Sequence, residues 1–181
     1  MKRAALTTAA IATLALAGCA AGRSDAPEPV AQSPAAASAQ LRDAGGRTVA
    51  AASISQVGDA LRVRVEATGL MPGVYGAHLH AVGRCDAPGF ESAGPHWNPG
   101  NREHGRDNPR GQHLGDLPNL LVGTDGRGSF EYTIQSGGLA GGPRRLLDAD
   151  GAAVLLHARP DDYRTDPSGN SGSRIACGVL T

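Results

Sequence analysis

The chain has 181 residues, which is enough for one domain with a hydrophobic core and too few for two domains of ordinary size. Its 26 glycines and 12 prolines, with aromatic residues at only 3%, favour a turn-rich β protein over a helical bundle, because glycine and proline destabilise helix interiors. A formal net charge of zero gives no sign of a polyanion-binding surface, so no nucleic-acid partner is expected.

The N-terminus has the organisation of an export signal. Lys2 and Arg3 precede an apolar run over residues 4–17, which is too short to span a bilayer. The run leads into the sequence LAGC, which resembles the bacterial lipobox, where a signal peptidase cuts before the cysteine and the thiol carries a lipid. We therefore predict a lipoprotein signal peptide over 1–18 and lipidation of Cys19. An ordinary secretory peptide with a coincidental cysteine is the alternative.

A tether is expected after the lipid. From Ala20 to about Gln40 the chain is rich in Ala, Ser, Pro and Gln and offers little apolar surface to bury, so residues 19–40 are predicted to be flexible. The folded domain is expected over residues 41–181. By resemblance to Gram-negative lipoproteins, alanine at position 20 favours an anchor at the periplasmic side of the outer membrane, in contact with the membrane only through the lipid.

The domain is expected to be all-β. Alternation of small or apolar with polar residues predicts strands over 48–55 and 60–67, joined as a hairpin through Gly58 and Asp59. Further strands are predicted over residues 73–80, 119–122, 128–134 and 152–158. No segment after Ala20 has convincing helical periodicity, so we expect an antiparallel Greek-key β-sandwich or flattened barrel.

Two long loops are expected within this domain, over 81–118 and 159–174, and both are rich in Gly, Pro, Asp and Asn. Loops of this length are uncommon in a compact domain unless they are functional. The chain has no glycine-rich phosphate loop and no serine nucleophile elbow, so its histidines are the main chemical signal.

The cysteines are consistent with export. If Cys19 carries the lipid, Cys85 and Cys177 remain as an even pair in an oxidising compartment. A disulfide between them is expected, and two buried free thiols are the alternative.

All six histidines lie beyond the first predicted hairpin. His78 and His80 stand two apart at the end of a predicted strand, so their side chains share a face and could hold one ion, although a solvated or core pair is an alternative. In the following polar loop, three more histidines and a carboxylate make a closed tetrahedral zinc set: His96, His104, His113 and Asp116.

His157 ends a later apolar strand, from which it could meet the pair formed by His78 and His80 across the sheet. Imidazole-rich sites of this kind suit copper and zinc. A copper site and a zinc site that share one imidazole need seven protein ligands, and the chain offers seven candidates.

Five ordered motifs resemble the copper/zinc superoxide dismutases: GAHLH (76–80), AGPHWNP (93–99), EHG (103–105), QHLGD (112–116) and GSRIACG (172–178). The resemblance extends from about residue 45 to the C-terminus. It implies one copper ion and one zinc ion per subunit. The implied copper ligands are His78, His80, His96 and His157, and the implied zinc ligands are His96, His104, His113 and Asp116, with His96 as the bridge.

The same resemblance implies a Cys85–Cys177 disulfide and a carboxylate, Asp161, that links a copper-site to a zinc-site histidine. Asp162, next in the chain, leaves the choice of carboxylate open. The resemblance also places Arg174 at the approach to copper, with a catalytic role for it and for His96. The implied activity is dismutation of the superoxide anion to O2 and H2O2. A non-catalytic copper/zinc-binding lipoprotein on the same fold is the main alternative, and a zinc hydrolase is a weaker one.

The sequence departs from the better-known animal pattern in two loops. Ala81 follows the second copper histidine, and the segment from Cys85 to His96 is reshaped. This segment contributes to subunit contacts in the family. A homodimer is therefore expected, but the reshaped segment argues against the eukaryotic type of interface. In the second loop, Arg159 and Arg164 are candidates for additional steering of the anion.

Overall fold

The computed structural model describes residues 35–181. The predicted signal peptide (1–18), the predicted lipidation site Cys19 and most of the predicted tether lie outside the described residues. Within the described part, no helix has the length and hydropathy needed to cross a membrane.

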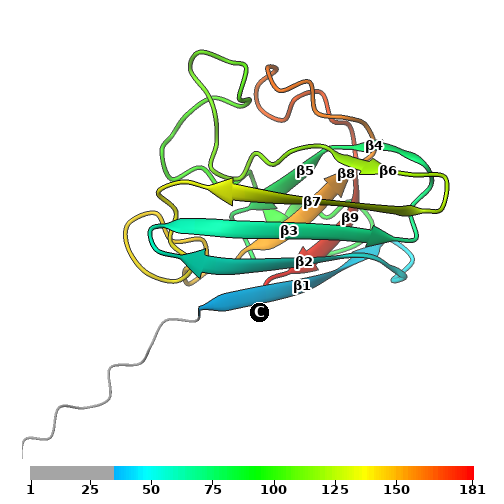
Figure 1. Cartoon of the computed structure of the whole chain (residues 1–181), viewed down its shortest axis with the longest axis horizontal. Coiled ribbons are helices and arrows are strands. Elements are labelled where there is room, and N and C mark those ends of the chain that lie inside the picture. Colours follow the sequence, from blue (N-terminus) through cyan, green and yellow to red (C-terminus); the bar gives the residue numbers. More distant parts are fainter. Residues whose placement is uncertain (1–34) are drawn as a thin grey trace, which may run out of the picture. The chain divides into compact units, whose positions relative to one another are not determined.

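The described residues form a curled antiparallel β-sheet (Figure 1). The elements in chain order are β1 (Ala36–Asp43), β2 (Thr48–Val57), β3 (Ala60–Thr68), β4 (Gly73–Tyr75), β5 (Ala77–His80), the 3-10 turn η1 (Glu91–Ala93), β6 (Leu120–Val122), β7 (Arg127–Ile134), β8 (Ala153–His157) and β9 (Arg174–Val179). Seven strands are hydrogen-bonded in the order β5-β8-β9-β1-β2-β3-β7, and β4 pairs with β6. This confirms the predicted all-β antiparallel fold.

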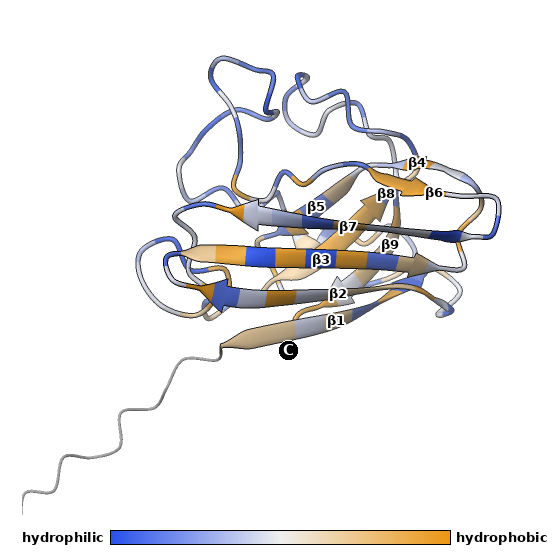
Figure 2. Ribbon diagram, in the orientation of Figure 1, coloured by the Kyte–Doolittle hydropathy of each residue, from blue (hydrophilic) through white to orange (hydrophobic). Residues whose placement is uncertain are grey.

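The β2–β3 hairpin shows how the alternation of residues determines which face of the sheet is buried. The two strands pair from Val57↔Ala60 onward across Gly58, whose positive φ of 61° suits a tight turn. Along β3, apolar residues are buried and the intervening charged residues are exposed, which Figure 2 shows as alternating colours. Burial of each large apolar side chain is worth about 1.5–3 kcal/mol, so the strand has one stable orientation.

The folded domain begins earlier than predicted. β1 starts at Ala36, inside the predicted tether, and pairs with β2 along most of its length. Ala37, Ala39 and Leu41 are buried while the residues between them are exposed. Because alanine has little apolar surface, the alternation of alanine with polar residues is hard to distinguish from the composition of a linker. The burial of these alanines becomes evident only in the folded sheet. β9 was also not predicted as a strand; it pairs with both β8 and β1.

The two predicted loops are present between β5 and β6 and between β8 and β9, and they stand at one end of the sheet in Figure 1. They contact each other directly, since the Asp107 N–H donates to the Tyr163 carbonyl at 3.0 Å. β5 and β8 are paired neighbours, with His78 opposite Leu155. The histidine-bearing strand ends and the two polar loops therefore meet in one region.

Candidate metal centre

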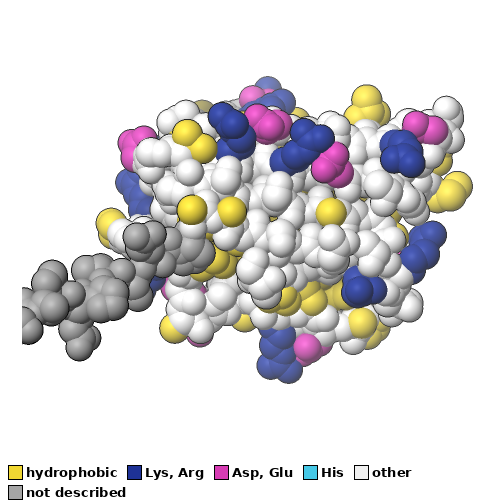
Figure 3. Space-filling view, turned by 60° about the horizontal axis from the view of Figure 1, so that its bottom comes forward, with side chains coloured by type: hydrophobic (Ala, Val, Ile, Leu, Met, Phe, Trp, Pro, Cys, Tyr) yellow, Lys and Arg dark blue, Asp and Glu magenta, His cyan; other side chains and the backbone are white. Residues whose placement is uncertain are grey.

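All six histidines are buried, with exposed fractions between 0% and 7%. None is visible on the described part of the face shown in Figure 3, where charged side chains lie scattered among uncharged ones. Buried polar groups are costly unless they have partners, so six buried imidazoles require an explanation.

The first group consists of His78, His80, His96 and His157, whose potential ligand atoms all lie within 4.8 Å of one another. β5 supplies His78 and His80 on the same face, and β8 supplies His157 at its end. His96 comes from the long loop and lies opposite His80 in an isolated β-bridge. The predicted convergence of His157 with the β5 pair is thus observed.

Three ring nitrogens of this group are buried without any hydrogen-bond partner: His78 Nδ1, His80 Nε2 and His157 Nε2. The opposite nitrogen of each ring has a partner: His78 Nε2 with Asp161 Oδ2 at 2.8 Å, His80 Nδ1 with the Gly94 carbonyl at 2.8 Å, and His157 Nδ1 with the Gly172 carbonyl at 3.0 Å. Since each partner is an oxygen acceptor, it fixes the ring proton on its own side and leaves the unpartnered nitrogen with a lone pair. Neutral imidazole nitrogens converging in this way fit a copper ion.

The second group is centred on Asp116. Its Oδ1 lies 3.0 Å from His96 Nδ1, 3.0 Å from His104 Nδ1 and 3.1 Å from His113 Nδ1. The Nδ1 atoms of His96 and His113 are themselves only 3.3 Å apart. Three imidazole nitrogens around one carboxylate oxygen are the donor set of a closed tetrahedral zinc site. His96 belongs to both groups. His78 also lies close to the second one, since the potential ligand atoms of His78, His96, His104 and Asp116 all lie within 4.8 Å of one another.

Strand β5 positions the loop that carries this second group. The Leu79 N–H donates to the Gly115 carbonyl at 2.9 Å, and the Leu79 carbonyl accepts from the Trp97 N–H at 2.8 Å. A Cβ atom at Gly115 would collide with the Leu79 carbonyl, so glycine permits this close approach. His96 and Asp116 are therefore both held along the edge of β5 that is not paired with β8, next to the strand histidines.

The two groups differ in charge. Burial lowers the pKa of His78 to about 3 and that of His157 to about 4, which keeps these imidazoles neutral. For His104, burial opposes protonation, but hydrogen bonds to Asp116 and Asp161 outweigh it and raise the pKa to about 9. Burial alone would raise the pKa of Asp116, yet its hydrogen bonds with His104, His113 and His96 hold it well below the usual range. Asp116 thus keeps its negative charge, and His104 would release a proton when its ring nitrogen binds a cation.

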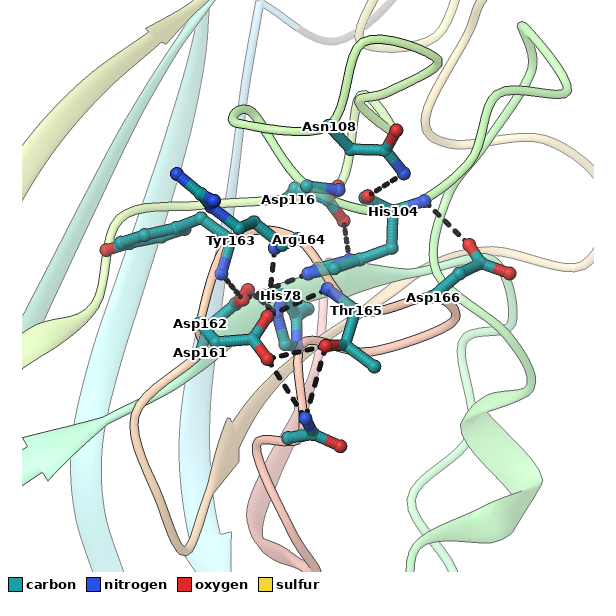
Figure 4. A network of polar contacts seen from close by, with 12 residues as sticks. His78, His104, Asn108, Asp116, Asp161, Asp162, Tyr163, Arg164, Thr165 and Asp166 are labelled. Carbon is teal, nitrogen blue, oxygen red and sulfur yellow. Dashed lines mark hydrogen bonds and ion pairs between the residues drawn. The ribbon is translucent and has the colours of Figure 1, made fainter.

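Asp161 connects the two groups (Figure 4). Its Oδ2 lies 2.8 Å from His78 Nε2, and its Oδ1 lies 3.0 Å from His104 Nε2. Asp162 is exposed and instead accepts hydrogen bonds from Thr165 and Asn170. Of the two candidate carboxylates, it is Asp161 that lies between the two histidines.

Arg174 is anchored beside the first group. Its Nη1 donates to the Phe90 carbonyl at 2.7 Å and its Nη2 to the Gly94 carbonyl at 2.8 Å. The guanidinium lines a pocket of about 970 Å³ that also contains His96 and His157. Arg174 thus places a positive charge in the same pocket as two histidines of the first group.

Two other arginines line this pocket, Arg102 and Arg145. Neither was predicted from the sequence; the predicted candidates, Arg159 and Arg164, are not among the lining residues. Nothing in the local sequence distinguishes these four arginines, because their distance from the pocket depends on the paths of the loops.

The predicted disulfide joins Cys85 and Cys177, whose Cα atoms are 5.7 Å apart, so the alternative of two free thiols is excluded. The bond ties the first part of the long loop to β9. Arg174 binds the same part of the loop through the Phe90 and Gly94 carbonyls, so the disulfide also supports the anchor of the arginine.

A curled antiparallel sheet with two buried ligand groups that share one histidine defines a two-metal β protein. A family model described as copper/zinc superoxide dismutase (SODC) matches residues 48–180, and the chain belongs to this family. It is 44% identical over 144 residues to the superoxide dismutase-like protein YojM of Bacillus subtilis, covering 78% of this chain and 74% of that protein.

Two further relatives agree with this placement. The chain is 38% identical over 147 residues to a Cu-Zn superoxide dismutase of Caulobacter vibrioides, covering 80% of this chain and 84% of that protein. A crystal structure of a SOD-like protein from Bacillus subtilis superimposes with a TM-score of 0.75 at 42% identity, covering 80% of this chain and 97% of the other.

Proposed function

We propose that this chain is a superoxide dismutase that converts two superoxide anions and two protons into O2 and H2O2. The observation that supports this activity above all is His96, which belongs to both ligand groups. A shared imidazole couples the two sites chemically, whereas a protein that only stores metal needs no such coupling.

In this proposal His78, His80, His96 and His157 hold one copper ion, and His96, His104, His113 and Asp116 hold one zinc ion. Both donor sets fit, as the unpartnered nitrogens of the first group and the carboxylate-centred second group indicate. When bound, copper would supply one-electron redox chemistry and zinc a fixed positive charge.

The residues of the chain then have separate tasks. Arg174, held by two carbonyls, binds and orients the superoxide anion at the pocket beside His96. His96 keeps Nδ1 directed at Asp116, so its Nε2 is the atom that takes up a proton and passes it to the product. Asp161 accepts hydrogen bonds from the Nε2–H groups of His78 and His104 and thereby keeps both rings in one orientation.

The main alternative is a non-catalytic copper/zinc-binding lipoprotein on the same fold. It is favoured by one relative, YojM, whose name describes it only as superoxide dismutase-like. This alternative requires the ligands but neither Arg174 nor an accessible pocket. A zinc hydrolase would need an open ligand position and a carboxylate base, and the shared histidine argues against it.

The test is to load the purified protein with copper and zinc, measure bound metal, and follow superoxide decay directly. We expect loss of activity on metal removal and recovery only when copper is restored. A protein that binds one ion of each metal but does not accelerate superoxide decay would refute the dismutase and support the metal-binding alternative.

Replacement of Arg174 should separate anion capture from metal binding. We expect Arg174→Ala to retain both metals but to lower the rate constant for superoxide about tenfold and to weaken its dependence on ionic strength. The exposed Arg127 on β7 provides a matched control, since Arg127→Ala removes the same charge away from the pocket. An unchanged rate and salt dependence in Arg174→Ala would contradict the role given to this arginine.

We also propose that the chain is exported and anchored by a lipid on Cys19, at the periplasmic side of the outer membrane in a Gram-negative cell. The signal sequence and alanine at position 20 support this location. In detergent phase partitioning, the wild type should enter the detergent phase and Cys19→Ala should enter the aqueous phase. A variant that stays in the detergent phase would show that another element binds the membrane.

Homodimer formation stays a prediction.

A further inference from the structure

Tyr163 lies where the two long loops meet. It belongs to the loop between β8 and β9 and has a positive φ of 61°, a strained conformation for a residue with a side chain. This conformation turns its N–H back to Asp161, where it donates to Oδ1 at 2.6 Å (Figure 4). The same Oδ1 contacts His104 Nε2. Tyr163 therefore binds the oxygen atom that orients a histidine of the second group.

The Tyr163 side chain also reaches the segment that precedes β6. Its hydroxyl oxygen accepts the Asn119 N–H at 2.8 Å. The side-chain amide of Asn119 in turn makes two hydrogen bonds to the backbone of Asp161. Its Nδ2 donates to the Asp161 carbonyl at 2.9 Å, and its Oδ1 accepts the Asp161 N–H at 2.8 Å. The tyrosine and the asparagine thus enclose Asp161 between two loops.

Arg106, in the loop that carries the second group, places its guanidinium carbon 3.7 Å from the centre of the Tyr163 ring. The Tyr163 carbonyl accepts the Asp107 N–H beside it, and Gly105 packs so closely on that carbonyl that a Cβ atom would not fit. A cation over an aromatic face adds attraction to these backbone contacts.

Arg106 and Tyr163 also form part of the wall of a small hollow that reaches Asp116. The hollow measures about 10 Å³, which is at the lower limit for one water molecule. The large pocket, by contrast, reaches His96 and His113 but not Asp116. The second group thus borders two hollows, and Arg106 and Tyr163 line the smaller one on the Asp116 side.

We propose that Tyr163, with Arg106 on its ring, is a positioning residue that holds Asp161 against His104 and closes the Asp116 side of the second group, and so slows zinc release. The inference rests on the proposed binding of zinc by this group. It concerns retention of the metal and not the chemistry of superoxide.

The test measures zinc release from the metal-loaded protein to a colorimetric chelator. We expect release to be about two- to fivefold faster in Arg106→Gln, the increase that corresponds to loss of one exposed cation–π contact. Tyr163→Ala should release zinc on the order of tenfold faster, because it removes both the ring beneath Arg106 and the hydroxyl that accepts the Asn119 N–H. Tyr163→Phe keeps the ring but loses that hydroxyl, so its release rate should fall between those of the wild type and Tyr163→Ala.

A spectroscopic measurement separates positioning from general loosening. With cobalt(II) in place of zinc, Tyr163→Ala should shift the visible absorption bands, because His104 changes orientation, and Tyr163→Phe, which loses only the hydroxyl, should shift them less. Matched controls are Tyr75→Phe, which removes a hydroxyl bound to the Met71 carbonyl, and Arg127→Gln, and both should behave as wild type.

The inference is overturned if the wild type retains zinc but Arg106→Gln and Tyr163→Ala release it at the wild-type rate, or if the controls release it equally fast. A wild type that retains zinc without dismutating superoxide would refute the proposed activity and leave this inference standing. A wild type that binds no zinc would overturn both.

Discussion

His96→Ala should lower dismutation by on the order of 100-fold or more and should disturb both metals at once. His78 and His96 lie in both clusters of potential ligands, but of these two only His96 has a ring nitrogen within hydrogen-bond distance of Asp116, at 3.0 Å. The ring centre of His96 is 4.0 Å from that of His78 and 5.3 Å from that of His113. Loss of a residue that merely orients a metal ligand already costs about 10–100-fold in affinity or activity, so loss of a ligand shared by two ions should cost at least as much. The measurements are the superoxide decay rate and the content of each metal.

Two further variants provide the matched comparison, because they change a histidine that contacts only one group. His157→Ala should lose copper and keep zinc, whereas His113→Ala should weaken zinc and keep copper. The bridging role of His96 would be refuted if His96→Ala lost only one metal, as either of these variants is expected to do.

Removal of the disulfide by the double substitution Cys85→Ser and Cys177→Ser should lower the free energy of unfolding by about 4–5 kcal/mol. The bond closes a segment with a sequence separation of 92 residues, and the chain-entropy model assigns a crosslink of this length roughly that value. Activity should also fall, because Arg174 is held by carbonyls of the loop that the disulfide ties down. Urea denaturation of the metal-free and metal-loaded proteins measures the first effect.

Cys19→Ala is the control for this experiment, since it removes a thiol that lies outside the described domain. It should leave the denaturation midpoint unchanged. If the double variant unfolded at the same urea concentration as the wild type, the disulfide would not be the main constraint on the long loop.

The metal centre could be anticipated from the sequence because ligand chemistry depends on residue type and local spacing. His78 and His80 alternate along one strand, and strand geometry places such residues on the same face. The zinc set was predicted from donor chemistry, since three histidines and Asp116 within one polar loop supply the four ligands of a tetrahedral zinc site. These inferences needed only the chain order of the residues.

The first strand was missed because alanine gives a weak signal. Ala37 and Ala39 form part of the interior only because β2 and β9 lie beside them and larger side chains surround them. Likewise, no local feature distinguished Arg145 from Arg159, although only the former lines the pocket.

Chain order was enough to predict the type of fold, the seven ligand candidates and, if Cys19 carries the lipid, a disulfide between Cys85 and Cys177, because periodicity, donor chemistry and cysteine parity are properties of the sequence. The folded chain was needed to establish which ring nitrogens of His78, His80 and His157 stay unpartnered, that Asp161 and not Asp162 joins the two groups, and which arginines line the pocket. Those features depend on contacts between loops that are far apart in the chain. Tyr163, which connects both loops to Asp161, is the clearest example.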